Sequence, residues 1–152
     1  MIKARYTQQG ATLIEVLIAI VVLSIGLLGM AGLQATSIQS NYSAYYRSQA
    51  TVLSYDYADR IRANRTTALS MTSDTSFPTS SSTNSVSGTQ FAKDKAQWLN
   101  MLALTLPDGT GRVERNGTLI TISIRWTDDR GRIKLASDTT ATSETFVYRT
   151  NI

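Results

Sequence analysis

The sequence of 152 residues contains neither cysteine nor histidine. Without cysteine, the protein can form no disulfide bond and has no thiol that could act as a nucleophile or as a metal ligand. Without histidine, it also lacks the commonest general base and the commonest metal ligand of proteins. These two absences argue against an enzyme, and we expect no catalytic residue and no metal site.

A strong charge of one sign is also missing. The chain has 15 lysines and arginines against 11 aspartates and glutamates, which gives a net charge of +4. Lys3 and Arg5 provide two of these charges, so only +2 (4 − 2) remains after Gly10, where the arginines are scattered among acidic residues. Such a mild excess is weak support for nucleic-acid binding, and we expect no nucleic-acid partner.

One long apolar run is present, from Ala11 to Leu33, and it contains the carboxylate of Glu15. The run is long enough to span a membrane as a helix and too long for the apolar part of a secretory signal peptide. Lys3 and Arg5 before it favour a cytoplasmic start of the chain. An acidic side chain at the centre of such a helix costs about 2.5 to 3.5 kcal/mol, so Glu15 needs a compensating partner.

The residues before and around Glu15 resemble the start of type IV pilins and pseudopilins. The basic leader MIKARYTQQG is followed by Ala11, by the tetrad TLIE that ends at Glu15, and by the long apolar run. The resemblance implies that prepilin peptidase cleaves between Gly10 and Ala11 and that the new terminal nitrogen of Ala11 is methylated. Ala11 stands where the family usually has phenylalanine, a change that members tolerate. The alternative is a plain signal anchor.

The resemblance also implies a role for Glu15. In the family, cleavage exposes an α-amine that pairs with this carboxylate between neighbouring subunits, which sets their axial register. Buried ion pairs are better suited to fixing register than to adding stability. The implied partners are other minor and major pilins, prepilin peptidase, the inner-membrane pilus assembly platform, and membrane lipid before assembly. The family uses no cofactor.

Apolar and aromatic residues at helical spacing continue beyond the run and predict one helix from about Thr12 to about Asn64. One face of its second half, which we expect to pack under a sheet, carries Ile38, Tyr42, Tyr45, Tyr46, Leu53, Tyr57 and Ile61. The other face carries Gln39, Ser40, Arg47, Asp56 and Arg60. Gly26, Gly29 and Gly32 lie one turn apart, which favours either close helix packing in a membrane or a weak point in the helix.

Several segments are similar to one group of minor pilins, the type IV pilus modification proteins PilV. They are SIGLLGMAGLQ, YADRIRANR and WLNMLALTLPDGTGRVERNGTLITISIRW. The second contains Asp59, Arg60 and Arg62 and ends with Arg65. These residues can form an ordinary charged helix end, with arginines near the negative end of the dipole and Asn64 as a cap. Alternatively, they form a surface that contacts a neighbouring subunit.

The middle of the chain changes composition. Residues 66–90 are rich in serine and threonine and predict a loop. Residues 91–106 predict a short helix that ends at Pro107-Asp108-Gly109. Its apolar stripe, which we expect in the core, consists of Phe91, Trp98, Leu99, Leu102 and Leu106.

The end of the chain predicts an antiparallel sheet of three or four strands over residues 112–150. Residues 112–116 and 118–127 flank Asn116-Gly117, a hairpin-turn signal. In the second strand the residues expected in the core are Ile120, Ile122, Ile124 and Trp126, which alternate with Thr121, Ser123 and Arg125.

Two further strands are expected at residues 132–136 and 145–150. In the last one, Phe146 and Tyr148 alternate with Val147 and Arg149. Asp128-Asp129 is interpreted as a solvated turn rather than a metal site or an acid–base pair.

The sequence as a whole predicts an α+β, type IV pilin-like fold and a non-enzymatic minor pilin that takes part in pilus initiation or tip formation. The alternatives are a minor pseudopilin of a type II secretion system and a signal-anchored periplasmic binding module. The expected location is the bacterial inner membrane, crossed once, and the cell-surface pilus. The expected parts are a leader at 1–10, a membrane segment at 11–33 and a periplasmic domain at 34–152, whose helical part is 34–65.

Overall fold

The computed structural model describes residues 12–128 and 142–152. The chain divides into two compact units, residues 1–38 and 39–152. Helix α1 (Leu13–Ala63) contributes residues to both units, and each unit is treated by itself below. The start and end of α1 lie within one residue of the helix that the apolar periodicity predicts.

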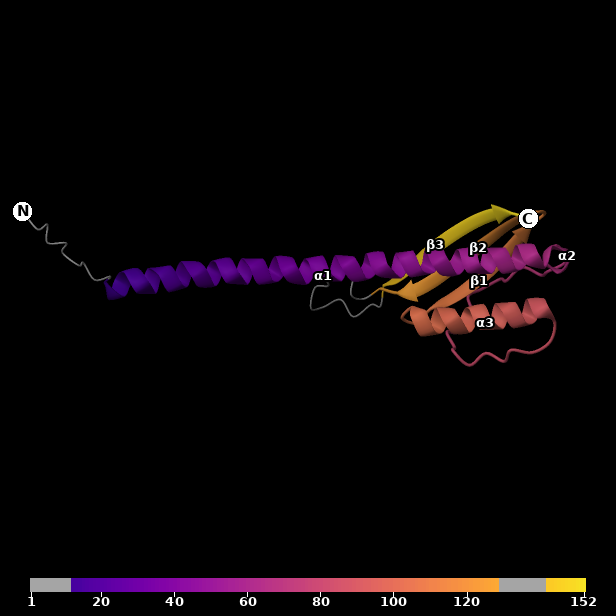
Figure 1. Cartoon of the computed structure of the whole chain (residues 1–152), viewed down its shortest axis with the longest axis horizontal. Coiled ribbons are helices and arrows are strands. Elements are labelled where there is room, and N and C mark those ends of the chain that lie inside the picture. The colour runs from indigo at the N-terminus through magenta and orange to yellow at the C-terminus, as the bar shows by residue number, and fades with distance from the viewer. Residues whose placement is uncertain (1–11, 129–141) are drawn as a thin grey trace, which may run out of the picture. The chain divides into compact units, whose positions relative to one another are not determined.

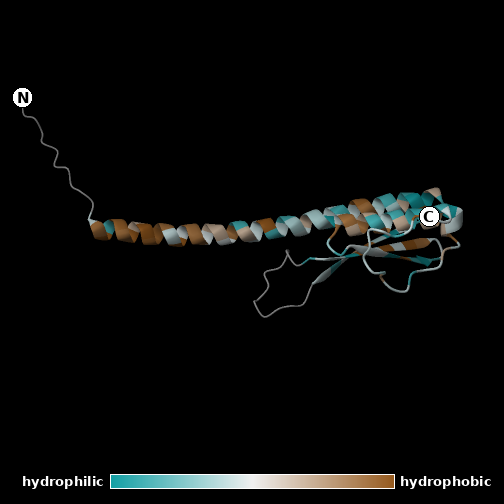
Figure 2. Ribbon diagram, turned by 90° about the horizontal axis from the view of Figure 1, so that it is seen from below, coloured by the Kyte–Doolittle hydropathy of each residue, from teal (hydrophilic) through white to brown (hydrophobic). Residues whose placement is uncertain are grey.

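The first unit is described from residue 12 and is entirely helical from Leu13 onward. Its large apolar side chains are all exposed, with exposed fractions that reach 88% at Leu13 and 76% at Leu28. Figure 2 shows the strongly hydrophobic colouring of this part of α1. Among the described residues, α1 is the one helix that is long and apolar enough to cross a membrane.

The second unit combines helices with a sheet (Figure 1). After α1 come α2 (Arg65–Ala68), α3 (Gln90–Thr105) and the strands β1 (Thr110–Asn116), β2 (Leu119–Thr127) and β3 (Ser143–Asn151). The strands form one antiparallel sheet in the order β1-β2-β3. The α+β fold with a helix packed on a three-stranded antiparallel sheet is therefore confirmed.

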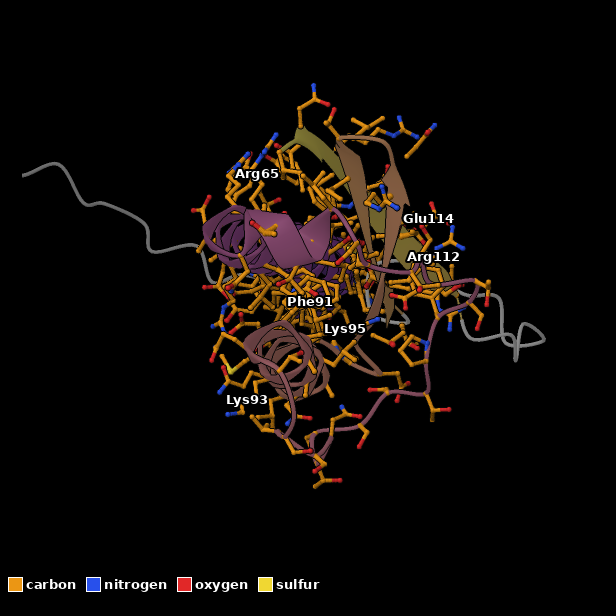
Figure 3. All side chains as sticks on the ribbon, turned by 90° about the vertical axis from the view of Figure 1, so that its right-hand side faces the viewer. Arg65, Phe91, Lys93, Lys95, Arg112 and Glu114 are labelled. Carbon is orange, nitrogen blue, oxygen red and sulfur yellow. The ribbon has the colours of Figure 1, made fainter. Side chains whose placement is uncertain are left out.

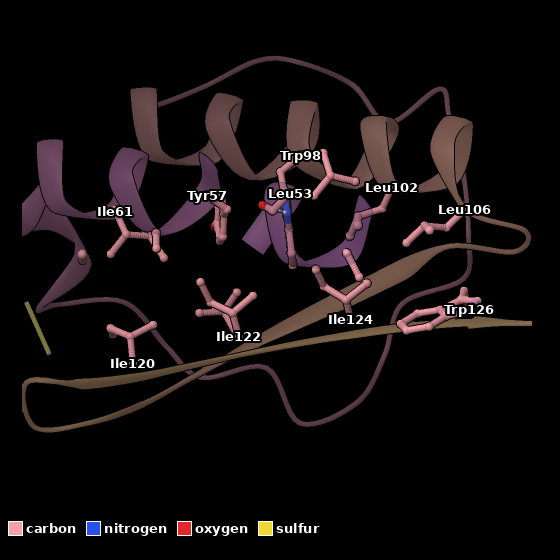
Figure 4. Packing of buried hydrophobic residues seen from close by; sticks show 14 of the residues in the cluster. Leu53, Tyr57, Ile61, Trp98, Leu102, Leu106, Ile120, Ile122, Ile124 and Trp126 are labelled. Atoms are coloured by element: carbon pink, nitrogen blue, oxygen red, sulfur yellow. Dashed lines mark hydrogen bonds between the residues drawn. The ribbon is translucent and has the colours of Figure 1, made fainter. Parts of the chain in front are cut away.

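The core of this unit lies between the sheet and the two longer helices (Figure 4). From α1 it includes Tyr46, Leu53, Tyr57 and Ile61; from α3, Trp98 and Leu102; from the sheet, Val113, Ile120, Ile122, Ile124 and Trp126. The alternation of β2 and the stripe of α3 thus point into the core as predicted. The ring of Tyr57 stacks on that of Trp98 with 4.3 Å between centroids, and the Trp98 indole donates to the backbone oxygen of Leu53 at 3.1 Å.

Helix α3 has clear signals at both ends. At its start, the side chain of Thr89 accepts a hydrogen bond from the backbone nitrogen of Ala92 at 3.3 Å, which satisfies one of the free donors of a helix N-terminus. After its last turn, Asp108 adopts a positive φ of 50°. A side chain at Gly109 would overlap the backbone of Leu102. The Pro-Asp-Gly stop therefore needs its glycine for close packing.

The hairpin between β1 and β2 is one residue away from its predicted position. Asn116 is paired with Leu119, so Asn116 ends the strand and the two loop residues are Gly117 and Thr118. Gly117 has φ +63°. Glycine at the first loop position is the requirement of a type II′ turn, which explains why the Asn-Gly signal found the hairpin but placed its loop too early.

Part of the predicted buried face of α1 is wrong. Ile38, Tyr42 and Tyr45 are exposed by 55%, 45% and 53%, respectively. Burial begins at Tyr46, where side chains of the sheet and of α3 are available to cover the helix. Helical spacing marked the correct face but could not show how far along the helix its cover extends.

The predicted loop at residues 66–90 is also only partly correct. Helix α2 occupies its first residues, Ala68 is fully buried, and Met71 is exposed by only 9%. These two apolar side chains join the core cluster, and their burial stabilises a short helical turn that the polar composition of the whole segment concealed.

Two polar residues near the sheet are more buried than predicted. Ser123 is exposed by only 2% and lies on the central strand β2, opposite Arg112 and Val147 in the register. Asp128 is exposed by 3%, and its backbone nitrogen donates to Thr142 at 2.9 Å. Asp128 is therefore not part of a solvated turn. Asp129 and the strand predicted at 132–136 lie outside the described residues.

Candidate functional site

The first candidate site is the beginning of helix α1. The backbone nitrogen of Glu15 donates to the side-chain oxygen of Thr12 at 3.4 Å and to its backbone oxygen at 3.1 Å. Val16 continues the helix with a bond to the same backbone oxygen at 3.3 Å. Thr12 and Glu15 have the spacing of a capping box, so the tetrad TLIE forms a helix start by local chemistry alone.

Glu15 lies in the first turn of α1, and its side chain is exposed among exposed apolar residues. A carboxylate is favourable there because the first turn is the positive end of the helix dipole. Because the residue is exposed, the carboxylate is accessible to a cation of another molecule. Gly10 and Ala11, the predicted cleavage and methylation residues, lie outside the described residues.

The second candidate site is at the other end of α1, where we define the helix-end cluster as Asp59, Arg60, Arg62, Asn64 and Arg65. Arg60 bonds Asp56 on its own helix at 2.9 Å and the side-chain oxygen of Gln97 on α3 at 2.9 Å. Arg60 also lies 3.8 Å from the carboxylate of Asp94 on α3. It therefore links the end of α1 to α3.

The other arginines of the helix-end cluster contact the end of the chain. Arg62 bonds Asp59 at 2.6 Å and the hydroxyl of Thr150 on β3 at 2.5 Å. The hydrogen bond that the Arg62 guanidinium donates to Asp59 raises the pKa of that guanidinium. Arg65 donates to the backbone oxygen of Ile152 at 3.3 Å. All three arginines thus have partners inside the unit, as expected of a structural helix end, whereas Asp59 is 73% exposed.

Sequence reasoning missed the residue that holds this end together, Asp94 of α3. Its carboxylate is almost buried and accepts from Asn64 at 3.1 Å and from Gln90 at 2.8 Å. Asn64 has φ −112°, so it does not end the helix as a left-handed cap; its side chain instead bonds to another helix. A charged residue one turn before Trp98 on the apolar stripe was the available signal for Asp94.

Two family models match the chain. The model of the prokaryotic N-terminal methylation motif matches residues 5–31, and the model of type IV pilin Tt1218 matches residues 32–97. Together they run without a gap from residue 5 to residue 97 and cover more than half of the chain. The chain belongs to the type IV pilin family. No curated protein and no solved structure gave a match.

The family assignment gives the two candidate sites a common context. The methylation motif includes the beginning of α1 with Glu15, and the pilin model includes the helix-end cluster and the first half of α3. Type IV pilins are structural rather than enzymatic proteins. A pilin with this motif is a substrate of prepilin peptidase and assembles with other pilins, and its long apolar helix is consistent with anchoring in a membrane and a place in a pilus.

Proposed function

We propose that this pilin is a minor subunit of a type IV pilus that takes part in initiating the filament or forming its tip. The observation that carries the structural role is the exposed side chain of Glu15 in the first turn of an exposed apolar helix, within the methylation motif. The minor role is supported by the PilV-like segments, which include the end of α1 and the Trp98 helix.

Processing comes first in this proposal. Residues 1–10 form the leader, residues 11–33 anchor the chain in the inner membrane, and residues 34–152 form the periplasmic domain. Prepilin peptidase cleaves after Gly10 and methylates Ala11. Mass spectrometry of the protein from its native membrane should therefore show a chain that begins at Ala11 with a methylated nitrogen. A chain that still begins at Met1 would contradict processing.

Glu15 sets the axial register during assembly. Its carboxylate is costly in the apolar part of a membrane, and the α-amine of a processed neighbouring subunit is a cation of the correct sign to compensate for that cost. Glu15→Gln removes the charge and keeps the size of the side chain. Breaking one partner of a buried ion pair costs about 3 to 5 kcal/mol, so the variant should be cleaved normally but fail to enter filaments.

The matched control is Ser24→Ala, on the same exposed part of α1. Among the residues that the structure describes, the Ser24 hydroxyl bonds only the backbone oxygen of Ile20, at 2.7 Å within its own helix. Both variants are expressed in a strain without the native copy, their cleavage is checked by mass, and sheared pili are probed for the protein. Normal incorporation of Glu15→Gln together with normal pilus numbers would overturn the register role.

Quantification of the same sheared pili tests the minor role. A tip or initiating subunit should be present at a few copies per filament, and deletion of its gene should reduce the number of pili without changing the composition of those that form. If instead the deletion leaves pili unchanged and abolishes secretion of folded proteins to the medium, the chain is a minor pseudopilin of a type II secretion system.

The exposed part of the helix-end cluster is a possible subunit contact. Asp59 is the member best placed for it, because its side chain is the most exposed carboxylate among the ion pairs of this end of α1. Asp59→Asn should reduce incorporation into pili while the unfolding midpoint of the protein changes little, since exposed ion pairs contribute at most about 1 kcal/mol. Equal incorporation would leave the cluster with a structural role alone.

A further inference from the structure

The face of the sheet that lies away from α1 carries charged side chains. Figure 3 shows Arg112 and Glu114 on that side. Arg125 shares the face, because it pairs with Thr110, which lies two residues before Arg112 on β1. The ring of Phe77, from the Ser/Thr-rich loop, lies against both arginines, 4.9 Å from the guanidinium carbon of Arg112 and 4.5 Å from that of Arg125.

The two arginines differ in their charge partners. Arg112 forms an ion pair with Glu114 at 3.3 Å. Among the described residues, the Arg125 guanidinium has no ion pair and no hydrogen bond, and Phe77 is its one recorded partner. Stacking on an aromatic ring holds a guanidinium in place while its planar set of N–H donors stays available to a planar acceptor such as a carboxylate.

Arg125 lines a pocket of about 410 Å³ together with Asp108, Thr110 and the loop residues 77–80. The pocket wall is tied down by hydrogen bonds: Thr110 donates to the backbone oxygen of Pro78 at 2.7 Å, and Ser80 donates to that of Gly109 at 2.8 Å. Pockets of this volume are of the size that binds small ligands.

The second charge of the pocket decides what kind of ligand fits. Asp108 lines the same pocket but forms no ion pair with Arg125; its carboxylate accepts from the hydroxyl of Thr127 at 3.1 Å. A carboxylate on the wall repels phosphate dianions and polyanions, and its remaining lone pairs accept hydrogen bonds from hydroxyl groups. A ligand that pairs with Arg125 and also hydrogen-bonds to Asp108 carries one negative charge at one end and hydroxyl groups at the other.

We propose that this pocket, which we call the Phe77 pocket, binds a hydroxylated carboxylate of the size of an acidic sugar residue. The carboxylate of the ligand pairs with the fork of Arg125, and its hydroxyl groups donate to Asp108. Acidic sugars occur free and within surface polysaccharides, and both sources present the same group. This binding site is independent of the proposed role in pilus initiation.

The test is an isothermal calorimetric titration of the full chain in detergent with D-glucuronate. Three further compounds test the carboxylate contact with Arg125 and the hydroxyl contacts with Asp108 separately. D-glucose lacks the carboxylate, acetate lacks the hydroxyl groups, and inorganic phosphate carries more charge. Glucuronate should bind with saturation and at least about tenfold more tightly than each of the three, because a charge-assisted bidentate pair and the hydroxyl contacts are both required. An acidic oligosaccharide that binds while glucuronate does not would contradict a single-residue site.

Variants locate the binding. Arg125→Gln should weaken glucuronate binding at least about tenfold, and Arg125→Lys, which keeps the charge but not the fork, should weaken it less. Asp108→Asn should weaken it several-fold without making acetate bind better than glucuronate. Arg149→Gln, at an exposed arginine of β3, is the matched control and should leave binding unchanged.

The proposal is overturned by a lack of saturable glucuronate binding, by equal binding of acetate or phosphate, or by unchanged affinity in Arg125→Gln. Because loss of Arg125 could disturb the loop, each variant is compared with the unchanged protein by tryptophan fluorescence and unfolding midpoint. A normal midpoint with weakened binding assigns the effect to the Phe77 pocket. A lowered midpoint makes Asp108→Asn the deciding variant, and unchanged affinity there also overturns the proposal.

Discussion

The two units of the chain share helix α1 and use its apolar residues in opposite ways. In the first unit, the apolar side chains from Leu13 to Leu33 are exposed, whereas in the second unit Leu53, Tyr57 and Ile61 are buried. Full burial of a large apolar side chain contributes about 1.5 to 3 kcal/mol. The second unit obtains this contribution from its own sheet and α3, and the first unit needs a membrane or neighbouring subunits to obtain it.

Glycines show the same contrast. A side chain added at Gly26, Gly29 or Gly32 would meet no other atom within 4 Å. A side chain added at Gly111 would overlap the ring of Trp98. The protein itself therefore gives the glycines of the first unit no packing role, which leaves both close packing with another helix and a weak point in α1 as reasons for them. Gly111, in contrast, is required by its own core.

The largest expected effect comes from removing a ring that only the second unit can bury. Trp98→Ala should lower the free energy of unfolding by about 3 to 5 kcal/mol, because Trp98 is exposed by 1%, stacks on Tyr57 and bonds Leu53. Leu28→Ala, at an exposed position of the first unit, should change it by less than about 0.5 kcal/mol. Unfolding of the full chain by urea in detergent, monitored by tryptophan fluorescence, measures both changes.

Trp126→Ala tests the sheet side of the same core. Trp126 is exposed by 2%, so its loss should also cost about 3 to 5 kcal/mol. Its indole nitrogen is buried and has no hydrogen-bond partner among residues 12–128 and 142–152, which should place the cost below that of Trp98→Ala. Fluorescence of Trp98 follows the unfolding. A loss below about 1 kcal/mol would mean that this end of β2 is not part of the core.

A smaller effect is expected from adding a methyl group in each unit. Gly111→Ala should destabilise the second unit by about 1 to 3 kcal/mol, the usual cost of overpacking. Gly26→Ala should leave the unfolding midpoint of the second unit unchanged. Gly26 lies in the first unit, where nothing surrounds it, and alanine favours a helix by about 1 kcal/mol relative to glycine. If Gly26→Ala instead prevents entry into pili while the protein stays folded and processed, the first-unit glycines serve packing between subunits.

The smallest effect concerns one hydroxyl group. Burial raises the pKa of Tyr57 above its ordinary value of 10.0, the charges of Asp74 and Asp94 add to this, and Arg60 opposes it. Its hydroxyl is buried and has no hydrogen-bond partner in the part of the chain that the structure describes. Tyr57→Phe should therefore be neutral or stabilising by about 1 kcal/mol at pH 8. Tyr45→Phe, at an exposed tyrosine of the same helix, should have no measurable effect.

The pH dependence has a definite sign. Because the folded-state pKa of Tyr57 is raised, the unfolded chain loses the proton first, so the free energy of unfolding falls as pH rises above about 10. One such group contributes at most about 1.4 kcal/mol per pH unit. The decline between pH 8 and pH 10.5 should be steeper in the unchanged protein than in Tyr57→Phe. Equal slopes would mean that Tyr57 titrates normally in the folded protein.

Sequence reasoning succeeded where the pattern is local and repeated. The alternation from Ile120 to Trp126 identified the buried face of β2, and the stripe of Trp98 and Leu102 identified that of α3. It failed at Tyr42 and Tyr45, because helical periodicity continues whether or not another element covers the helix. It also failed at Ser123 and Asp128, whose burial depends on segments far away in the sequence.

The candidate sites divide in the same way. Glu15 and the methylation motif could be found from the sequence, since a cap, a carboxylate and an apolar run are consecutive. The partners of the helix-end cluster could not, because the bond between Arg62 and Thr150 joins residues 88 positions apart and that between Asn64 and Asp94 joins residues 30 positions apart. The Phe77 pocket was hidden for the same reason.

The sequence by itself determined the pilin-type beginning of α1, the helical and strand periodicities and the hairpin, because each depends on residues within a few positions of one another. Only the tertiary structure decided where the cover of α1 starts, that Asp94 receives Asn64, and that Phe77 lies against Arg112 and Arg125. Those outcomes depend on which distant segments pack together, and burial, charge pairing and the shape of a pocket exist only after that packing has formed.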